Sequence, residues 1–234
     1  MDMGTTSAAQ AFGQNLVIES LDKTYPGAEH PVFAGYSLNL PGGSLCAIVG
    51  VSGIGKTTLL NCIAALDTWD SGAITVGDES VPKDDPLQGA LYRRRKVGMA
   101  FQWPRLLPEF TVLENMEMPL RIDNTLGEAE SGWCKQLLEL VGLRDLMNRL
   151  PSQISGGQAA RAGLARALVR RPAMWLLDEP TGNLDPETAS EVFKLLLTLH
   201  KELRPTTLVV THNPVLADGC EIVERLKTNY SDSI

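Results

Sequence analysis

Long apolar runs are missing from this sequence of 234 residues, and so is any excess of positive charge. Its most apolar stretches, such as "KLLLTLH", are far shorter than the roughly 18 to 20 residues that a membrane-spanning helix requires. We therefore expect no such helix. The formal charge of −7 argues against a general affinity for nucleic acid or anionic lipid, because both need a basic surface. A local basic patch remains compatible with this charge.

Paired cysteines and a secretory signal are also missing. No CxxC pair and no nearby histidine cluster accompany the four cysteines, which argues against a zinc site or a redox motif and predicts ordinary thiols in a reducing compartment; they are Cys46, Cys62, Cys134 and Cys220. The first residues, "MDMGTTSAAQAFGQN", have neither a basic start nor an apolar core. We expect a mobile tail over residues 1–15 and a cytosolic protein.

Short β-branched or apolar runs alternate with helical patterns along the chain. The runs that predict strands are "LVIESL", "LCAIVG", "VGMAFQ", "MWLLDE", "TTLVVTH" and "CEIVERL". Such alternation predicts an α/β fold with a mixed, largely parallel sheet, while "PVFAGYSLNLPGG" predicts an antiparallel flank. Between about residues 103 and 160 the strand pattern gives way to apolar residues at helical spacing. We expect a small helical subdomain there.

A phosphate-binding loop is the most specific single motif. Residues 50–57, "GVSGIGKT", match GxxxxGK[ST], follow the apolar run "LCAIV" and precede a helical pattern. An incidental glycine turn is the alternative, which this strand–loop–helix context disfavours. Lys56 is expected to contact the β- and γ-phosphates, and the Thr57 hydroxyl to hold Mg²⁺. The expected nucleotide-binding residues here are Gly50, Ser52, Gly53, Gly55, Lys56, Thr57 and Thr58.

Tyr25, in "LDKTYPG", is the candidate platform for a purine ring. An exposed aromatic side chain on the early flank could stack on adenine. The alternative is an ordinary aromatic residue at a strand end.

Polar residues at the ends of three expected strands are candidates for the chemistry. Asp178 and Glu179 end "MWLLDE", and successive strand residues point in opposite directions, so we assign Asp178 to Mg²⁺ through water and Glu179 to the attacking water as general base. Gln102, after "VGMAF", could touch Mg²⁺ or that water, and His212, after "TTLVVT", could bridge the γ-phosphate and the base. Taken alone, each of these two residues is better explained as a structural polar residue at the end of a strand.

Six motifs in order make the sequence resemble the ATP-binding cassette of ABC transporters: "GVSGIGKTT", "FQ", "ISGGQ", "LLDEP", "TGNLD" and "TH". The resemblance runs from about Leu16 to Leu226. It implies a P-loop NTPase core, ATP and Mg²⁺ as cofactors, and ATP hydrolysis. The implied ABC ATPase domain covers residues 16–228, with a C-terminal tail over 229–234.

The same resemblance assigns the loop "ISGGQ". In the family this loop closes on ATP held by a second cassette, so two cassettes pack head to tail with each site completed in trans. A homodimer is therefore expected, and Asp185 of "GNLD" would lie along the shared interface. The residues that would reach the other copy's nucleotide are Ser155, Gly156, Gly157 and Gln158. Ile154 replaces the usual Leu, and Ala159 and Ala160 replace residues that are generally polar.

Two longer stretches, "FQWPRLLPEFTVLENMEMPL" and "EPTGNLD", look most like cassettes of lipoprotein-releasing, macrolide-exporter-like and cell-division systems. The resemblance implies separate transmembrane permease subunits, which would contact a groove near Trp103 to Phe110. It also implies a cytoplasmic protein held peripherally on the inner face of the cell membrane by those subunits.

Other functions stay open at this point. ATP cycling could regulate an extracytoplasmic enzyme or complex without transport. A soluble ABC protein of DNA repair or translation is disfavoured, because it would carry long coiled coils or two cassettes and neither occurs in this sequence. A metabolite kinase is disfavoured because it would have no use for "ISGGQ". The basic run Arg93–Lys96 is interpreted as a solvated helix end, with a lipid-facing patch as the alternative.

Overall fold

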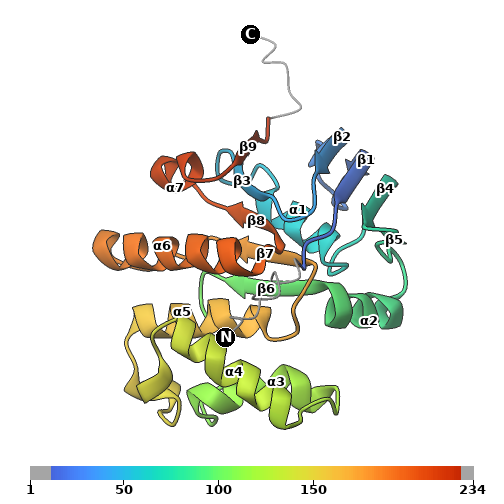
Figure 1. Ribbon diagram of the computed structural model, residues 1–234. Coiled ribbons are helices and arrows are strands. Elements are labelled where there is room, and N and C mark those ends of the chain that lie inside the picture. The colour runs from blue at the N-terminus through green and yellow to red at the C-terminus, as the bar shows by residue number, and fades with distance from the viewer. Residues whose placement is uncertain (1–11, 228–234) are drawn as a thin grey trace, which may run out of the picture.

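A five-stranded parallel sheet forms the centre of the computed structural model, which describes residues 12–227 (Figure 1). Every neighbouring pair in this sheet is parallel. Its strands, in spatial order, are β6 (Val97–Phe101), β7 (Met174–Asp178), β8 (Thr206–Val210), β3 (Leu45–Val49) and β9 (Ile222–Arg225). The central strands β7, β8 and β3 are mostly apolar and are buried along almost their whole length, because both faces of the sheet are covered.

Strand β7 shows how the sheet divides the core. Trp175 and Leu177 pack into a cluster with the helical subdomain, whereas Met174 and Leu176 pack into a cluster on the other face. The alternation follows from the two-residue period of a strand. The sheet therefore separates two hydrophobic cores.

The second core joins the parallel sheet to an antiparallel one. That sheet has the order β2 (Phe33–Leu40), β1 (Leu16–Lys23), β4 (Ser71–Val76) and β5 (Glu79–Ser80), and helix α1 (Lys56–Ile63) packs between the two sheets (Figure 1). The α/β class and the antiparallel flank are confirmed. Within the described residues the two kinds of strand form separate sheets rather than one mixed sheet. The sequence reading did not identify β4 and β5.

The helical subdomain contains α3 (Val112–Ile122), α4 (Glu128–Leu140) and α5 (Gly156–Leu168), with short 3₁₀ turns at Arg144–Leu146 and Pro151–Gln153. These helices lie together below the sheet in Figure 1. Helix α5 runs past the expected end at residue 160 and packs tightly on β6. A Cβ on Gly98 would lie 1.9 Å from the carbonyl oxygen of Ala167, so this contact depends on glycine.

Three further helices complete the fold: α2 (Pro86–Lys96), α6 (Pro186–Leu203) and α7 (Pro214–Asp218). Helix α2 is capped by Asp85, whose carboxylate accepts hydrogen bonds from the first-turn amides, and it ends in the basic run. Helix α6 buries one apolar face, with Val192, Leu196 and Leu199 among its buried residues.

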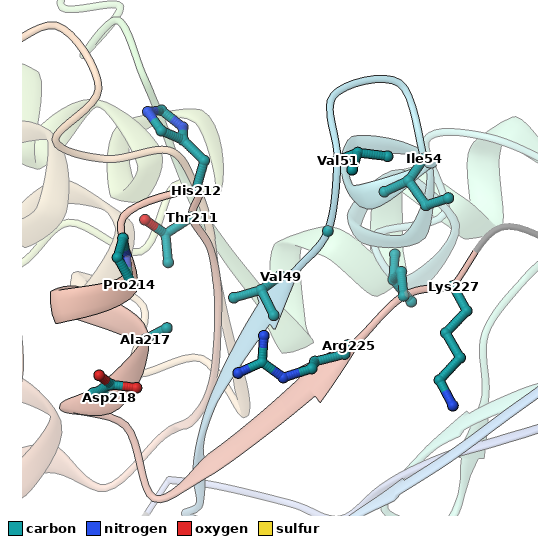
Figure 2. A pocket seen from close by; sticks show the side chains of 12 residues that line it. Val49, Val51, Ile54, Thr211, His212, Pro214, Ala217, Asp218, Arg225 and Lys227 are labelled. Carbon is teal, nitrogen blue, oxygen red and sulfur yellow. The ribbon is translucent and has the colours of Figure 1, made fainter.

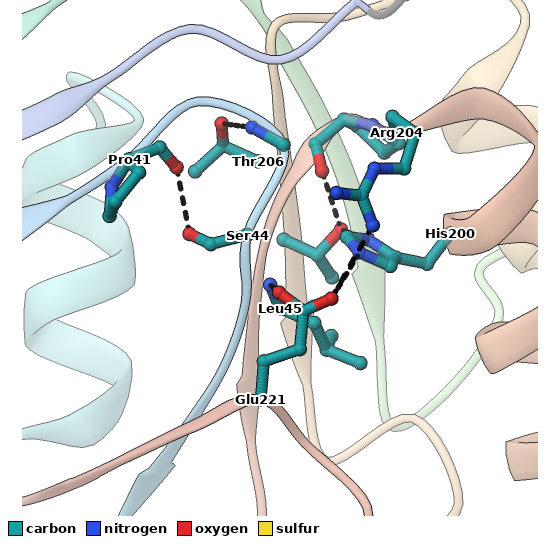
Figure 3. A network of polar contacts seen from close by, with 10 residues as sticks. Pro41, Ser44, Leu45, His200, Arg204, Thr206 and Glu221 are labelled. Carbon is teal, nitrogen blue, oxygen red and sulfur yellow. Dashed lines mark hydrogen bonds and ion pairs between the residues drawn. The ribbon is translucent and has the colours of Figure 1, made fainter.

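A polar network ties the end of α6 to the amino-terminal edge of the sheet (Figure 3). Glu221 accepts hydrogen bonds from the Leu45 amide (3.2 Å) and the Arg204 guanidinium (3.4 Å). The buried His200 ring contacts the Thr207 hydroxyl at 3.0 Å, and burial lowers the pKa of His200 while Glu221 opposes this shift. The neutral imidazole is therefore the form that this site favours.

Both expected tails fall largely outside the described residues. Of the first, 1–15, the structure describes residues 12–15, where the Phe12 and Gly13 amides donate to the carbonyls of Leu203 (3.4 Å) and Arg204 (3.0 Å). The second, 229–234, lies entirely outside.

The four cysteines are free thiols, and three of them are buried. Burial raises the pKa of Cys46 to about 12, with similar effects at Cys62 and Cys134. Such thiols stay protonated at neutral pH, so they pack as small apolar groups.

Candidate functional site

A cavity of about 470 Å³ opens where the loops after β3, β6, β7 and β8 meet. These loops all follow the carboxyl ends of parallel strands, where ligands of α/β proteins bind. Apart from Val210, every lining residue is one that the sequence singled out: Ser52, Gly53, Gly55, Lys56, Thr57, Thr58, Gln102, Asp178, Glu179 and His212. The fold thus gathers one candidate site from segments far apart in the chain.

The phosphate loop wraps the start of α1. Gly55 caps this helix with φ of 108°, a conformation that L side chains rarely adopt, and a Cβ there would meet Val32 at 2.4 Å. The Lys56 ammonium donates to the carbonyl oxygens of Gly50 (2.9 Å) and Val51 (3.0 Å). A positive charge and free helix-start amides therefore face the same cavity, which suits a phosphate group.

Two oxygen donors meet beside this loop. The Thr57 hydroxyl donates to the Asp178 carboxylate, at 3.0 Å from Oδ2. Burial raises the pKa of Asp178, and the Thr57 hydrogen bond and the Lys56 charge oppose that shift. A half-buried carboxylate next to a hydroxyl is a donor set suited to a small hard cation.

Glu179 is held in an unusual backbone conformation, with φ of 50°. Its amide donates to the Val210 carbonyl at 3.0 Å, and its own carbonyl accepts from the Gly182 amide at 3.0 Å, which fixes the turn. A left-handed non-glycine residue costs of order 1 to 3 kcal/mol and is common at functional sites. The turn brings Oε2 of Glu179 to 2.5 Å from Nδ1 of His212. The two candidates for base and sensor are thus in direct contact.

Gln102 is tied to the loop after β7. Its side-chain amide donates to Oδ1 of Asn183 at 2.9 Å, and the Asn183 amide donates to the Gln102 carbonyl at 3.3 Å. This two-way contact keeps Gln102 at the cavity wall, between the site and the helical subdomain.

Tyr25 lies next to the cavity but does not line it. Its hydroxyl donates to Asp67 at 2.6 Å and contacts the Thr58 hydroxyl at 3.1 Å, while the Lys23 ammonium sits 4.4 Å from the ring centroid. Burial and the Asp67 hydrogen bond raise the pKa of Tyr25. The ring is therefore fixed at the mouth of the site, with one face covered by a cation.

The "ISGGQ" residues lie at the start of α5 and do not line the cavity of their own chain. The Ser155 hydroxyl accepts from the Gln158 amide at 3.2 Å, and the Gln158 side chain accepts from the Ser155 amide at 2.8 Å. This reciprocal cap fixes the loop conformation. Ser155 and Gly156 are exposed, whereas their neighbour Ile154 is half-buried against the core.

The two glycines of this loop differ in their surroundings. A Cβ on Gly157 would lie 2.5 Å from Cγ2 of Thr188, whereas a Cβ on Gly156 would meet only Leu184, at 3.9 Å. Asp185, the remaining predicted binding residue, caps α6 by accepting from the Thr188 amide at 3.0 Å. Thr188 thus joins the starts of α5 and α6, and Asp185 also lies outside the cavity.

Gly50 lies on a neighbouring cavity of about 570 Å³ behind the phosphate loop. Figure 2 shows Val51 and Ile54 of the loop on one side of it and α7 on the other, with Arg225 reaching in from β9. His212 lines both cavities. The phosphate loop and His212 therefore form part of the wall of both cavities.

Two residues that the sequence reading missed support the site. Asp67 orients Tyr25, and Asn183 orients Gln102. Asn183 stands within the quoted motif "TGNLD", so the sequence contained a signal that could have identified it. No local pattern identifies Asp67, because its partner Tyr25 lies 42 residues away in the chain.

The expected partner region is partly exposed. Trp103 is 68% exposed, and of the stretch Trp103 to Phe110 only Leu107 lines the apolar groove of about 740 Å³ between α2 and α3. Met99, Met118 and Ile122 contribute to the same groove. No helix between residues 12 and 227 is both long and apolar enough to span a bilayer.

Comparison with known proteins extends these observations. A family model described as "ABC transporter" matches residues 33–182. A lipoprotein-releasing system ATP-binding protein LolD from Xanthomonas oryzae is 42% identical over 201 residues, covering 85% of this chain and 82% of its own. The protein of the same name from Myxococcus xanthus is 41% identical over 204 residues, covering 86% of this chain and 91% of its own.

A solved structure gives the matching fold. The ATP-binding cassette MJ0796, described as a dimer in a post-hydrolysis state bound to ADP and Pi, superposes with a TM-score of 0.79 at 33% identity. The match covers 91% of this chain and 94% of that one.

Proposed function

The chain belongs to the ABC transporter family, and from this premise we propose that it is the ATPase subunit of a lipoprotein-releasing transporter. It has the fold of an ATP-binding cassette and is an ATPase. The assignment of lipoproteins as cargo rests on the similarity to the LolD proteins. The observation that carries the activity is the contact of Glu179 with His212 beside the phosphate loop, at 2.5 Å.

The cavity residues divide the work of hydrolysis. Lys56 and the amides of the phosphate loop bind the phosphates, and Glu179 orients and deprotonates the attacking water. His212 holds Glu179 in place and faces the γ-phosphate. Gln102 would contact the same water or the cation. The Tyr25 ring would stack on adenine. The tight Glu179–His212 contact supports this assignment, because a base must be positioned before it acts.

Mg²⁺ fits the donors at the loop. Thr57 and Asp178 would hold it, and when bound it neutralises charge on the phosphates. In the part of the chain that the structure describes, no group of three or more His, Cys, Asp or Glu side chains is placed to hold a metal. Mg²⁺ is commonly bound by one or two carboxylates plus substrate phosphates, so the nucleotide would supply the remaining ligands.

A second copy of the chain completes each site in this proposal. Ser155, Gly156, Gly157 and Gln158 would reach the γ-phosphate on the other copy, and Asp185 would lie between the two sites. Their position outside the cavity of their own chain supports this, as does the dimeric state of the MJ0796 cassette. Because only ATP has the outer phosphate, ATP favours the closed dimer over ADP.

Permease subunits would hold the cassette at the cytoplasmic face of the membrane. The apolar groove beside Leu107 and the exposed Trp103 are the surface that we assign to them. Contiguous exposed apolar surface, such as this groove provides, is typical of protein contacts. Co-purification from membranes tests this: Trp103→Glu should reduce recovery of the permease, and Leu140→Glu, at an exposed leucine elsewhere in the subdomain, should not.

Blocked hydrolysis tests the trans site. Glu179→Gln with ATP and Mg²⁺ should accumulate a dimer on size-exclusion chromatography, because the γ-phosphate remains as a bridge. Ser155→Arg on this background should abolish the dimer by placing a bulky cation at the loop. Ser152→Arg is the matched control, an exposed serine three residues earlier, and should leave the dimer intact. A Ser155→Arg single variant that hydrolysed ATP at the full rate would contradict the arrangement.

A further inference from the structure

A basic pocket of about 420 Å³ lies outside the nucleotide cavity and shares no residue with it. Arg94 and Arg95, from the basic end of α2, meet Arg170 and Arg171, which follow α5. Helices α3 and α4 close the pocket, and Figure 1 shows α2 and α3 near each other at this end of the molecule. Four arginines from two distant segments thus converge in a chain whose formal charge is −7.

A single carboxylate serves two of these arginines. Asp123 Oδ1 contacts the Arg94 guanidinium, and its Oδ2 lies 2.5 Å from that of Arg170. Burial lowers the pKa of Arg170, Asp123 opposes this, and the nearby charge of Arg94 lowers it further. Arg94 and Arg170 therefore repel each other, and Asp123 neutralises only one of the two charges.

Arg171 adds a third charge with no acidic partner. Its guanidinium lies 4.9 Å from the centroid of the Trp133 ring, and the indole N–H of Trp133 donates to the Val169 carbonyl at 3.1 Å. Between residues 12 and 227, no carboxylate lies within 4 Å of Arg171. Arg95, in contrast, is paired with Glu79 at 2.6 Å. The ring contact fixes the Arg171 guanidinium and leaves its N–H donors free.

We propose that this pocket binds a phosphate-bearing anion through Arg94, Arg170 and Arg171. Guanidinium groups match phosphate oxygens in pairs, and the negative charge of a phosphate group would relieve the repulsion that Asp123 leaves. Glu130 also lines the pocket; its carboxylate accepts from the Gly127 amide at 3.2 Å and, within residues 12–227, forms no ion pair with these arginines. The phosphate could belong to a lipid headgroup or to a free phosphorylated compound, which share the same recognition chemistry.

Inorganic pyrophosphate is the probe, titrated by calorimetry into the full chain carrying Lys56→Ala so that the phosphate loop contributes little. Arg171→Gln and Arg94→Gln should each weaken binding by about tenfold or more, the usual effect of losing a hydrogen bond to a charged group. Arg171 is exposed, so its substitution leaves folding intact, and a melting curve checks this. Arg144→Gln, at an exposed arginine paired with Glu139, is the matched control.

Vesicle sedimentation separates the two sources. If pyrophosphate binds and phosphatidylglycerol vesicles also sediment the chain in an Arg171-dependent manner, whereas phosphatidylcholine vesicles do not, the phosphate belongs to a lipid headgroup. If pyrophosphate binds and neither kind of vesicle does, it belongs to a free compound. Pyrophosphate affinity that is absent, or that is unchanged in both arginine variants, overturns the proposal. So does Arg171-dependent binding of a Glu-rich peptide without pyrophosphate binding, which would make the pocket a protein contact.

Discussion

The two glycines at the start of α5 provide a sharp test of the packing. In Gly157→Ala the new methyl group would lie 2.5 Å from Cγ2 of Thr188, but in Gly156→Ala its nearest neighbour would be 3.9 Å away. Threonine is stiff at χ1, so Thr188 yields only by moving its backbone or changing rotamer. Overpacking of this kind costs about 1 to 3 kcal/mol.

The comparison between the two variants isolates the clash. Replacing a helical glycine by alanine gains up to about 1 kcal/mol, and this gain is common to both positions. Gly157→Ala should therefore be about 1 to 3 kcal/mol less stable than Gly156→Ala, a difference of roughly 2 to 12 °C in Tm for a chain of this size.

Thermal and urea unfolding of both variants measure this difference, and Thr188→Ala supplies the decisive control. With the threonine methyl removed, Gly157→Ala should no longer destabilise: the double variant should be as stable as Thr188→Ala alone, or up to about 1 kcal/mol more stable, since the clashing atom is gone. Equal stability of the two glycine variants, or a double variant that shows no recovery, would refute the packing argument.

The other predictions concern the sheet and its polar edge. Gly98→Ala should lower stability by more than about 3 kcal/mol in urea unfolding, because its Cβ would lie 1.9 Å from a backbone oxygen, while Gly132→Ala, with open space around it, should be neutral or stabilising. His200 has a lowered pKa, so the unfolded chain binds the proton first as pH falls and stability is lost below about pH 6.5. His200→Gln should flatten that loss between about pH 7 and pH 5; an unchanged pH profile would show that His200 does not contribute.

Periodicity in the sequence was sufficient for the central strands. "LCAIV" is apolar throughout and "MWLLD" is apolar up to its last residue, Asp178, and this matches β3 and β7, which are covered on both faces. Strand β4 was missed because "SGAITV" is half exposed and starts with a small polar residue and a glycine. It is a strand because Ile74 pairs with Ile18 across 56 residues, a contact that no local pattern reveals.

The cavity could be predicted because its residues stand at the ends of recognisable strands. The left-handed turn at Glu179 and the clasp between Gln102 and Asn183 could not, since both depend on which loops the fold brings together. Only part of the arginine pocket could be recognised in the sequence. The basic run Arg93–Lys96 is evident there, but its proximity to Arg170 and Arg171 depends on the fold.

The short segment from Asn183 to Thr188 is clasped at both ends. Asn183 grips Gln102 at the end of β6, and Thr188 fits into the space left by the missing side chain of Gly157. Asp185 stiffens the span between them by bonding to the Thr188 amide. Through this segment Gln102, at the cavity wall, is connected within the same molecule to the first turn of α5, which carries Gly156 and Gly157.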